Sequence, residues 1–251
     1  MLIALALLQA FVTKPHVTIS VVPELTAIVA GMPQRVALRF QVEPGWHVYW
    51  KNPGESGVAT TASWKLPTGF TVDSLSYPTP ARLDVAGTVT HVLDGDVVFE
   101  ATIRPPARIS SRDSRLTTRV FYGICKNACY PGQASLSVTM PVRTDASRTM
   151  TWHAADSVFQ SRRPRTTGIT AGFTWKGDRG VLSVLVPPGC KGDSVTFFPE
   201  DRDLSPAAVT VPMPRGCGPA QFTIPLREKP KAGLRGVVVI GTGPRGYEVG
   251  K

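Results

Sequence analysis

The cysteines are the residues of this sequence whose type and spacing could do redox or metal chemistry, and there are 4 of them. Cys125 and Cys129 stand four positions apart, between the strand-like runs 116–124 and 133–142. A hairpin formed by these runs would bring the two Cβ atoms within the roughly 3.5–4.5 Å that a disulfide requires. Closing so short a loop would stabilise the fold by only about 2 kcal/mol. A disulfide between Cys125 and Cys129 at a hairpin tip would therefore add little to the stability of the fold.

Three interpretations of Cys125 and Cys129 compete. They could form a structural disulfide, or they could be two metal ligands that need two further ligands, with His47 and His91 as candidates. Two thiolates would suit Cu(I) in particular, because soft ligands favour it. They could also be a reactive dithiol, because the cation of Lys126 would favour a thiolate. The spacing alone leaves all three interpretations open.

Cys190 and Cys217 are the other two cysteines, and they stand alone in the C-terminal part of the chain. A bond between them would close a much longer loop and contribute about 3.5 kcal/mol. Small domains gain most from such a bond. We therefore expect a structural disulfide between Cys190 and Cys217.

The composition indicates which elements must position these cysteines. The chain has 251 residues, of which 42% are hydrophobic, so a core is available and global disorder is excluded. It contains 23 Gly and 23 Pro, which argues against long helices. No apolar run reaches the roughly 18 residues of a membrane-spanning helix. The net charge of +10 is spread along the chain without a nucleic-acid motif, and no nucleotide-binding or Ser-His-Asp pattern is present.

Alternating apolar and polar residues predict short strands through the first half of the chain. In the best example, Val36, Leu38 and Phe40 alternate with Arg35, Ala37, Arg39 and Gln41. Turn residues such as those at 52–54 and 94–96 separate the strands, which is typical of an immunoglobulin-like antiparallel β-sandwich. The strands are expected at 16–22, 36–42, 46–50, 70–76, 88–93, 97–103, 116–124 and 133–142.

The pattern changes after residue 143. Apolar residues at helical spacing predict a short helix within a linker at 144–166, with Asp145 or Ser147 as the N-cap and an end at Arg162. Strand patterns resume at 181–186, 194–198, 208–211, 222–226 and 237–241. We therefore expect a mainly β protein with a redox domain at 14–143 and a second small β domain at 167–251.

The N-terminus reads MLIALALLQA, which resembles the apolar core of a secretory signal peptide. We expect a signal peptide at 1–13 and export to an oxidising compartment. In such a compartment, disulfides persist.

Several ordered motifs resemble one family. Residues 45–57 read GWHVYWKNPGESG, residues 64–70 read WKLPTGF, residues 77–82 read YPTPAR, and residues 122–131 read YGICKNACYP. These stretches resemble the N-terminal domains of DsbD-type thiol:disulfide interchange proteins, and in particular the ScsB branch. The resemblance covers about residues 20–142, whereas the second domain matches only loosely.

The resemblance implies an immunoglobulin-like domain that acts in the periplasm as a thiol:disulfide oxidoreductase without a thioredoxin fold, and without a cofactor. Its partners would be a membrane-embedded thiol reductase of the DsbD, ScsB or CcdA type and periplasmic thioredoxin-fold proteins. The processes implied are cytochrome c biogenesis and copper tolerance. Cys129 would form the mixed disulfide with the partner, and Cys125 would resolve it. The alternatives are a binding module with two structural disulfides and a copper-handling protein.

The sequence also departs from the family. The sequence ends at Lys251 without a transmembrane or thioredoxin domain, so we expect a separate protein to donate electrons. In the family, a loop that often carries an aromatic residue shields the disulfide. The matching stretch at 83–92 contains no Phe, Tyr or Trp, and its only ring is that of His91.

Overall fold

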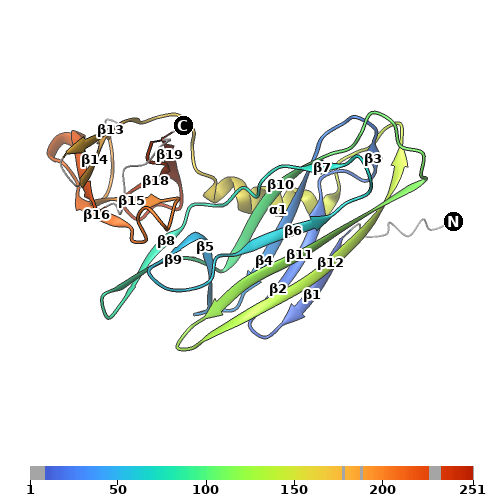
Figure 1. Ribbon diagram of the computed structural model, residues 1–251, viewed down its shortest axis with the longest axis horizontal. Coiled ribbons are helices and arrows are strands. Elements are labelled where there is room, and N and C mark those ends of the chain that lie inside the picture. Colours follow the sequence, from blue (N-terminus) through green and yellow to red (C-terminus); the bar gives the residue numbers. More distant parts are fainter. Residues whose placement is uncertain (1–8, 177–178, 187–188, 226–232, 251) are drawn as a thin grey trace. The chain divides into compact units, whose positions relative to one another are not determined.

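The computed structural model describes residues 9–176, 179–186, 189–225 and 233–250. The chain divides into two compact units (Figure 1). Unit 1 comprises Met1–Val48, Thr60–Pro78 and Asp94–Gln160, and unit 2 comprises Tyr49–Ala59, Thr79–Leu93 and Ser161–Lys251. In the described part of the chain, no helix is both long and apolar enough to cross a membrane.

Unit 1 is a sandwich of two sheets. The first has the order β1-β2-β4-β10-β7, in which every neighbouring pair is antiparallel. Its strands are β1 (Ala10–Lys14), β2 (Val17–Pro23), β4 (Gln34–Val42), β10 (Asp96–Arg104) and β7 (Thr71–Val72). Alternation along β4 buries Val36, Leu38 and Phe40, as the sequence pattern predicts.

The second sheet of unit 1 is built on one long hairpin. Its strands are β11 (Asp113–Cys125), β12 (Cys129–Arg143), β3 (Ile28–Val29) and β6 (Thr61–Lys65). The short strand β3 pairs with β12 in parallel, and β6 pairs with β11. The strand β5 (His47–Gly54) joins at its first residue, because His47 pairs with Cys125 of β11.

Aromatic rings join the two sheets across the core of unit 1. Phe40 of β4 contacts Tyr122 of β11 edge to face, with ring centroids 5.7 Å apart. Phe40 also contacts Phe99 of β10 in the same way at 5.3 Å. Such edge-to-face pairs stabilise a core beyond the area that they bury.

The one α-helix among the described residues, α1 (Met150–Arg162), covers part of unit 1. Its buried face consists of Trp152, Ala155 and Phe159, at helical spacing. The N-cap expected at Asp145 or Ser147 is wrong, because the hydroxyl of Thr149 accepts the hydrogen bond from the Trp152 amide at 3.2 Å. The helix ends at Arg162 as predicted.

Unit 2 contains two further sheets. One has the order β13-β14-β17 and the other the order β16-β15-β18-β19. Their strands are β13 (Thr170–Lys176), β14 (Arg179–Leu185), β17 (Pro219–Ile224), β16 (Val209–Pro212), β15 (Ser194–Pro199), β18 (Gly236–Ile240) and β19 (Gly246–Val249), with a short 3-10 turn, η1 (Arg215–Cys217). Phe197 and Phe222 contact each other in the core between these sheets, with centroids 6.2 Å apart.

Unit 2 also takes two segments from the middle of the sequence. One contains most of β5, and the other contains a hairpin of β8 (Ala81–Val85) and β9 (Thr88–Asp94). The amide of Asn52 in β5 donates hydrogen bonds to the carbonyls of Pro199 and Ser205, at 2.8 and 3.2 Å. Lys51 forms an ion pair with Glu200 at 2.9 Å. These contacts fasten the middle segment to the C-terminal part of unit 2.

The mainly β architecture expected from the sequence, with one short helix and a second β unit, is confirmed. The strand expected at 70–76 shortens to β7, since only Thr71 and Val72 pair with β10. Residues 1–8 of the expected signal peptide and Leu226 of the expected strand at 222–226 lie outside the described residues, whereas Ala10–Lys14 forms β1. The domain boundaries expected at 143/144 and 166/167 stay a prediction.

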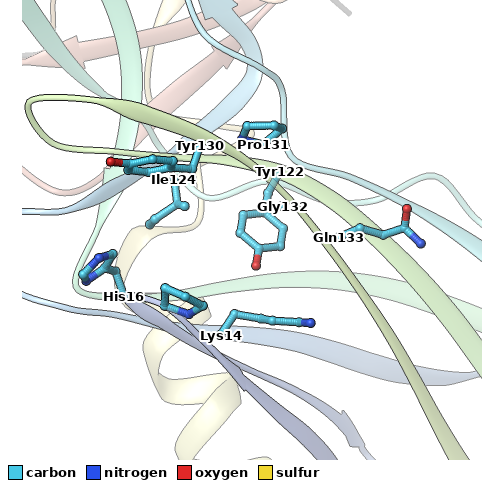
Figure 2. A pocket seen from close by; sticks show the side chains of 9 residues that line it. Lys14, His16, Tyr122, Ile124, Tyr130, Pro131, Gly132 and Gln133 are labelled. Carbon is cyan, nitrogen blue, oxygen red and sulfur yellow. The ribbon is translucent and has the colours of Figure 1, made fainter.

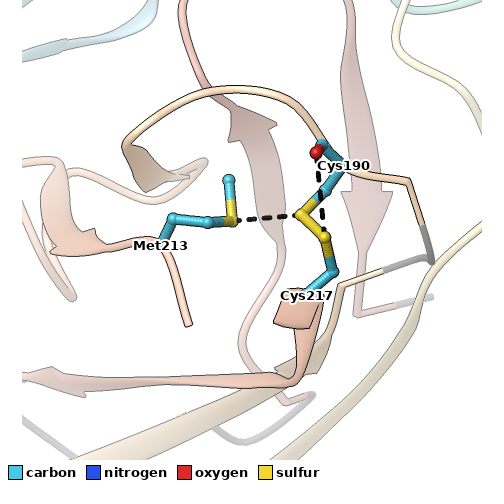
Figure 3. Close-up of a disulfide and its surroundings, with 3 residues drawn as sticks. All are labelled: Cys190, Met213 and Cys217. Atoms are coloured by element: carbon cyan, nitrogen blue, oxygen red, sulfur yellow. Dashed lines mark hydrogen bonds between the residues drawn. A yellow bond between two sulfur atoms is a disulfide. The ribbon is translucent and has the colours of Figure 1, made fainter. Parts of the chain in front are cut away.

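A disulfide joins Cys190 to Cys217 in unit 2, with the Cα atoms 5.9 Å apart (Figure 3). The Sδ atom of Met213 lies 3.5 Å from the Sγ atom of Cys190. All three side chains are partly buried against the core of the unit. The bond closes the loop that contains the strands β15 and β16.

We predict that the double variant Cys190→Ala/Cys217→Ala has a free energy of unfolding about 3.5 kcal/mol lower than the parent protein, because the unfolded chain regains the entropy of the open loop. Denaturant titration monitored by circular dichroism measures the change. The matched control is Cys125→Ala/Cys129→Ala, which opens a much shorter loop and should lose only about 2 kcal/mol. A larger loss in the control than in the Cys190/Cys217 variant would contradict this prediction.

Candidate functional site

The disulfide between Cys125 and Cys129 closes the tip of the β11–β12 hairpin. The two cysteines are the last residues to pair in the ladder, and their Cα atoms lie 4.2 Å apart. The turn between them is tight, with the Lys126 amide donating to the Ala128 carbonyl at 3.2 Å. The structure thus brings together the two residues that the sequence singles out for redox chemistry.

The two sulfur-bearing residues differ in exposure. Cys125 is only 1% exposed, whereas Cys129 is an exposed residue. A thiolate of another protein can reach a disulfide only through a sulfur that is open to solvent, because exchange proceeds by direct attack on that sulfur. The geometry therefore favours attack at Cys129.

His47 lies in line with the two cysteines across the sheet. Cys125 pairs with Cys129 on one side and with His47 of β5 on the other. Residues directly opposite each other in antiparallel strands have side chains on the same face. His47, Cys125 and Cys129 therefore lie in line on one face of three neighbouring strands.

The neighbours of these residues point to the opposite face, because side chains alternate along a strand. There Trp46 stacks on His16 of unit 1, with ring centroids 3.7 Å apart and planes 7° apart. Trp46 also approaches Tyr130, with centroids 6.2 Å apart. The ring of His16 is itself held by Glu43, whose carboxylate lies 2.7 Å from Nδ1. Trp46 thus belongs to a partly exposed aromatic cluster, one residue along the chain from His47.

A pocket of about 390 Å³ lies on this second face of the hairpin (Figure 2). Side chains from β11 and β12 form one wall, and the turn between β1 and β2 forms the other. The lining residues are Lys14, Pro15, His16, Tyr122, Ile124, Tyr130, Pro131, Gly132 and Gln133. Gly132 keeps the pocket wall close to Tyr122, because a Cβ atom at this position would lie 2.3 Å from the tyrosine ring.

Lys126 is the cation that the sequence places between the cysteines. Its side chain extends over Gly45, where an added Cβ atom would lie 3.1 Å from Nζ. Gly45 has a φ of +81°, a conformation that suits glycine in the turn before β5. The close approach of Lys126 is a second reason for glycine at this position.

The histidines named as candidate metal ligands have different environments. His47 lies opposite Cys125, whereas His91 belongs to unit 2 and is completely buried. The ring of His91 donates a hydrogen bond from Nδ1 to the Asn52 carbonyl at 2.7 Å. Among the residues that the structure describes, no group of three or more His, Cys, Asp or Glu residues is placed to hold a metal ion.

Burial changes the pKa of both histidines. The pKa of His47 lies below its ordinary value because burial disfavours the charged ring, although the carboxylate of Asp94 acts in the opposite direction. Burial lowers the pKa of His91 to about 4, which the hydrogen bond to Asn52 only partly offsets. The ring of His91 is therefore neutral at neutral pH.

One residue of the site, His16, escaped the sequence interpretation. His16 was assigned only to the start of a strand, yet it supports Trp46 from a turn with a φ of +65°. No local pattern signals this contact. His47, which the sequence analysis named as a residue that could join the cysteines, does lie opposite Cys125, whereas His91 does not.

Comparison with known proteins agrees with this description. A family model described as the N-terminal domain of the thiol:disulfide interchange protein DsbD matches residues 19–141, which include both cysteines of the hairpin and confirm the resemblance seen in the motifs. Among solved structures, the N-terminal periplasmic domain of ScsB from Proteus mirabilis is similar over 98% of this chain and 98% of that chain, with a TM-score of 0.71. The identity is 19%, so this likeness shows a shared fold.

A second solved structure, Salmonella enterica SafA pilin in complex with the SafB chaperone, aligns over 91% of this chain and 92% of that chain. Its TM-score of 0.23 and identity of 11% are too low to carry an argument. No curated protein matches the sequence.

We predict that the neutral, buried His91 makes stability depend on pH. The unfolded chain binds a proton at His91 near pH 6.5, whereas the folded chain binds it only near pH 4. Protons therefore favour the unfolded state in this window, and the free energy of unfolding should fall by about 2 kcal/mol between pH 7 and pH 5 on account of His91. Denaturant titrations at both pH values measure the fall.

The variant His91→Gln keeps an amide that can donate to Asn52 and should lose this part of the pH dependence. The matched control is His153→Gln on the exposed face of α1, which should retain it. Equal pH dependence in the parent protein and in His91→Gln would contradict the prediction.

Proposed function

Because the chain belongs, through residues 19–141, to the family of N-terminal domains of the thiol:disulfide interchange protein DsbD, we propose that it relays electrons between other proteins through Cys125 and Cys129. The observation that carries the proposal is the pair of cysteines at a hairpin tip, one exposed and the other buried. Cys129 is the interchange thiol, and Cys125 is the resolving thiol.

The relay consists of two thiol–disulfide exchanges. In the reduced chain, the Cys129 thiolate attacks a disulfide sulfur of the partner, and the second partner sulfur leaves as a thiolate. The Cys125 thiolate then attacks the Sγ atom of Cys129, which releases the first partner sulfur and closes the disulfide. Two electrons and two protons pass to the partner. The same steps in reverse reduce the chain.

The energetics of the hairpin support a redox role. A loop as short as that between Cys125 and Cys129 gives only about 2 kcal/mol of stabilisation. The two strands β11 and β12 pair from Asp113 opposite Pro141 up to the cysteines. This backbone pairing holds the hairpin together without the disulfide. Opening the disulfide therefore costs the fold little, as a bond that opens in every cycle requires.

We propose two kinds of partner. A membrane-embedded thiol reductase of the DsbD, ScsB or CcdA type supplies electrons, and periplasmic thioredoxin-fold proteins accept them. The presence of two disulfides suits an oxidising compartment such as the periplasm. In that setting, the chain acts as a thiol:disulfide oxidoreductase without a bound cofactor.

The role of each cysteine predicts different behaviour of two variants. Cys125→Ala should accumulate a mixed disulfide with a thioredoxin-fold protein, because Cys129 can attack and no internal thiol resolves the product. Cys129→Ala should give little complex, because Cys125 is buried. The partner is a variant that retains only one active-site cysteine, which is activated as a disulfide with thionitrobenzoate. Because its second active-site cysteine has been removed, the partner cannot reverse the reaction.

Released thionitrobenzoate and non-reducing gels measure the product, and Cys125→Ala/Cys129→Ala is the control that should form none. Equal trapping by the two single variants would contradict the assignment of roles. Absence of trapping by both would contradict the relay itself and leave a structural disulfide as the explanation.

A further inference from the structure

We infer that a pocket in unit 2 binds a ligand that carries a phosphate group. The pocket has a volume of about 620 Å³, and every residue that lines it belongs to unit 2. Its lining includes three cationic side chains, those of Arg165, Lys191 and Arg245. The inference is independent of the relay through Cys125 and Cys129.

The positive charge of the pocket has no counterpart in the described part of the chain. Among the described residues, neither Asp nor Glu lines the pocket, and none of its three cations forms an ion pair with a carboxylate. Other arginines do form such pairs, as Arg39 does with Asp96 and Arg104 does with Asp73. Because like charges around one pocket repel one another, a bound anion would relieve a repulsion that these residues leave in place.

The backbone holds Arg165 beside the strand β19. Its amide donates to the Gly246 carbonyl at 2.9 Å, and its carbonyl accepts from the Glu248 amide at 2.8 Å. Its guanidinium lies over the ring of Tyr247, 5.8 Å from the ring centroid. Such a contact with a ring face orients a guanidinium and leaves the N–H groups at its edge able to donate to a ligand.

Arg245 is oriented by a hydrogen bond of its own. Its Nε atom donates to the Ser161 carbonyl at 3.2 Å. A guanidinium also carries N–H donors on its two terminal nitrogens. The bond to Ser161 therefore fixes the direction of the side chain while the terminal nitrogens can serve a ligand.

Lys191 stands on a segment that is held at both of its neighbours. Cys190 is tied to Cys217 by the disulfide. Gly192 packs against Gly241 so closely that a Cβ atom on Gly192 would lie 2.5 Å from the Cα atom of Gly241. The backbone around all three cations is therefore positioned before a ligand arrives, which lowers the entropic cost of binding.

The charge and size of the pocket favour a phosphate group over a simple carboxylate. A phosphate group carries about −1.5 to −2 charges at pH 7 and three strong acceptor oxygens, whereas a carboxylate carries a single charge. Arginine matches phosphate oxygens with two parallel hydrogen bonds, and lysine adds a point charge. The volume lies within the roughly 300–1,000 Å³ of pockets that hold small organic molecules, so there is room for the group to which the phosphate is attached.

The test titrates the full chain, with both disulfides formed, with pyrophosphate at constant ionic strength by isothermal titration calorimetry. The parent protein should bind. Arg165→Gln, Lys191→Gln and Arg245→Gln should each weaken binding roughly 10-fold, because each removes a charge-assisted hydrogen bond. The matched control is Arg235→Gln, which removes the same charge from an exposed residue of unit 2 outside the pocket and should bind as the parent does.

Thermal denaturation separates a loss of binding from a loss of fold. Pyrophosphate should raise the melting temperature of the parent protein and of Arg235→Gln, because a ligand that binds only the folded state stabilises it. The three pocket variants should show a smaller rise. Without pyrophosphate they should melt near the parental temperature, because the replaced side chains are exposed.

Two further titrations identify the source of the phosphate group. Competition by glycerol 3-phosphate would indicate a soluble organic phosphate, whereas binding only to vesicles that contain phosphatidylglycerol would indicate a lipid headgroup; either result supports the phosphate site if the pocket variants lose it. Equal loss of binding in Arg235→Gln, acetate binding as tight as that of pyrophosphate, or no binding in any of these titrations would overturn the inference. The relay would stand in each case.

Discussion

The pairing of β11 with β12 is the constraint on which the rest of the site depends. Its register runs without interruption from Asp113 opposite Pro141 to Cys125 opposite Cys129. A slip of one residue would turn every side chain of the hairpin to the other face. Such a slip would take Leu116, Val120 and Tyr122 out of the core, so the burial of these side chains fixes the register. The same register brings the two cysteines together at the tip and separates them from the pocket, which lies on the other face.

Sequence reasoning predicted the parts of this arrangement that are local. Alternation of side chains located the long strands, and the cysteines were expected at a hairpin tip, because strand patterns and turn residues depend on neighbours in the chain. The N-cap at Thr149 and the short extent of β7 were missed, since each depends on a contact with a distant segment. The Thr149 hydroxyl donates to the carbonyl of Pro23, and β7 pairs only where it meets Ile103 and Arg104. The partnership of His47 with Cys125 likewise depends on a pairing that joins segments far apart in the sequence.

The motif at residues 45–57 combines two tasks that its sequence does not distinguish. Its first residues shape the redox site, where Trp46 stacks on His16 and His47 faces Cys125. Its later residues belong to unit 2, where the Asn52 side chain binds two carbonyls and also accepts the Gly54 amide at 3.0 Å. At Gly57, a Cβ atom would lie 2.3 Å from the Tyr49 ring, so only glycine fits. One strand thus places His47 opposite Cys125 at its start, and its later residues bind the C-terminal part of unit 2.

The unequal exposure of the two cysteines is the feature on which the proposed division of roles between them depends. An exposed resolving thiol could ionise in water without help, but it would also be open to attack by any thiol or oxidant. Burial of Cys125 at 1% exposure protects it, and the same burial removes the water that would accept its proton. Burial of Cys125 and exposure of Cys129 are therefore two consequences of one arrangement, in which the register of β11 and β12 places the two cysteines opposite each other at the hairpin tip.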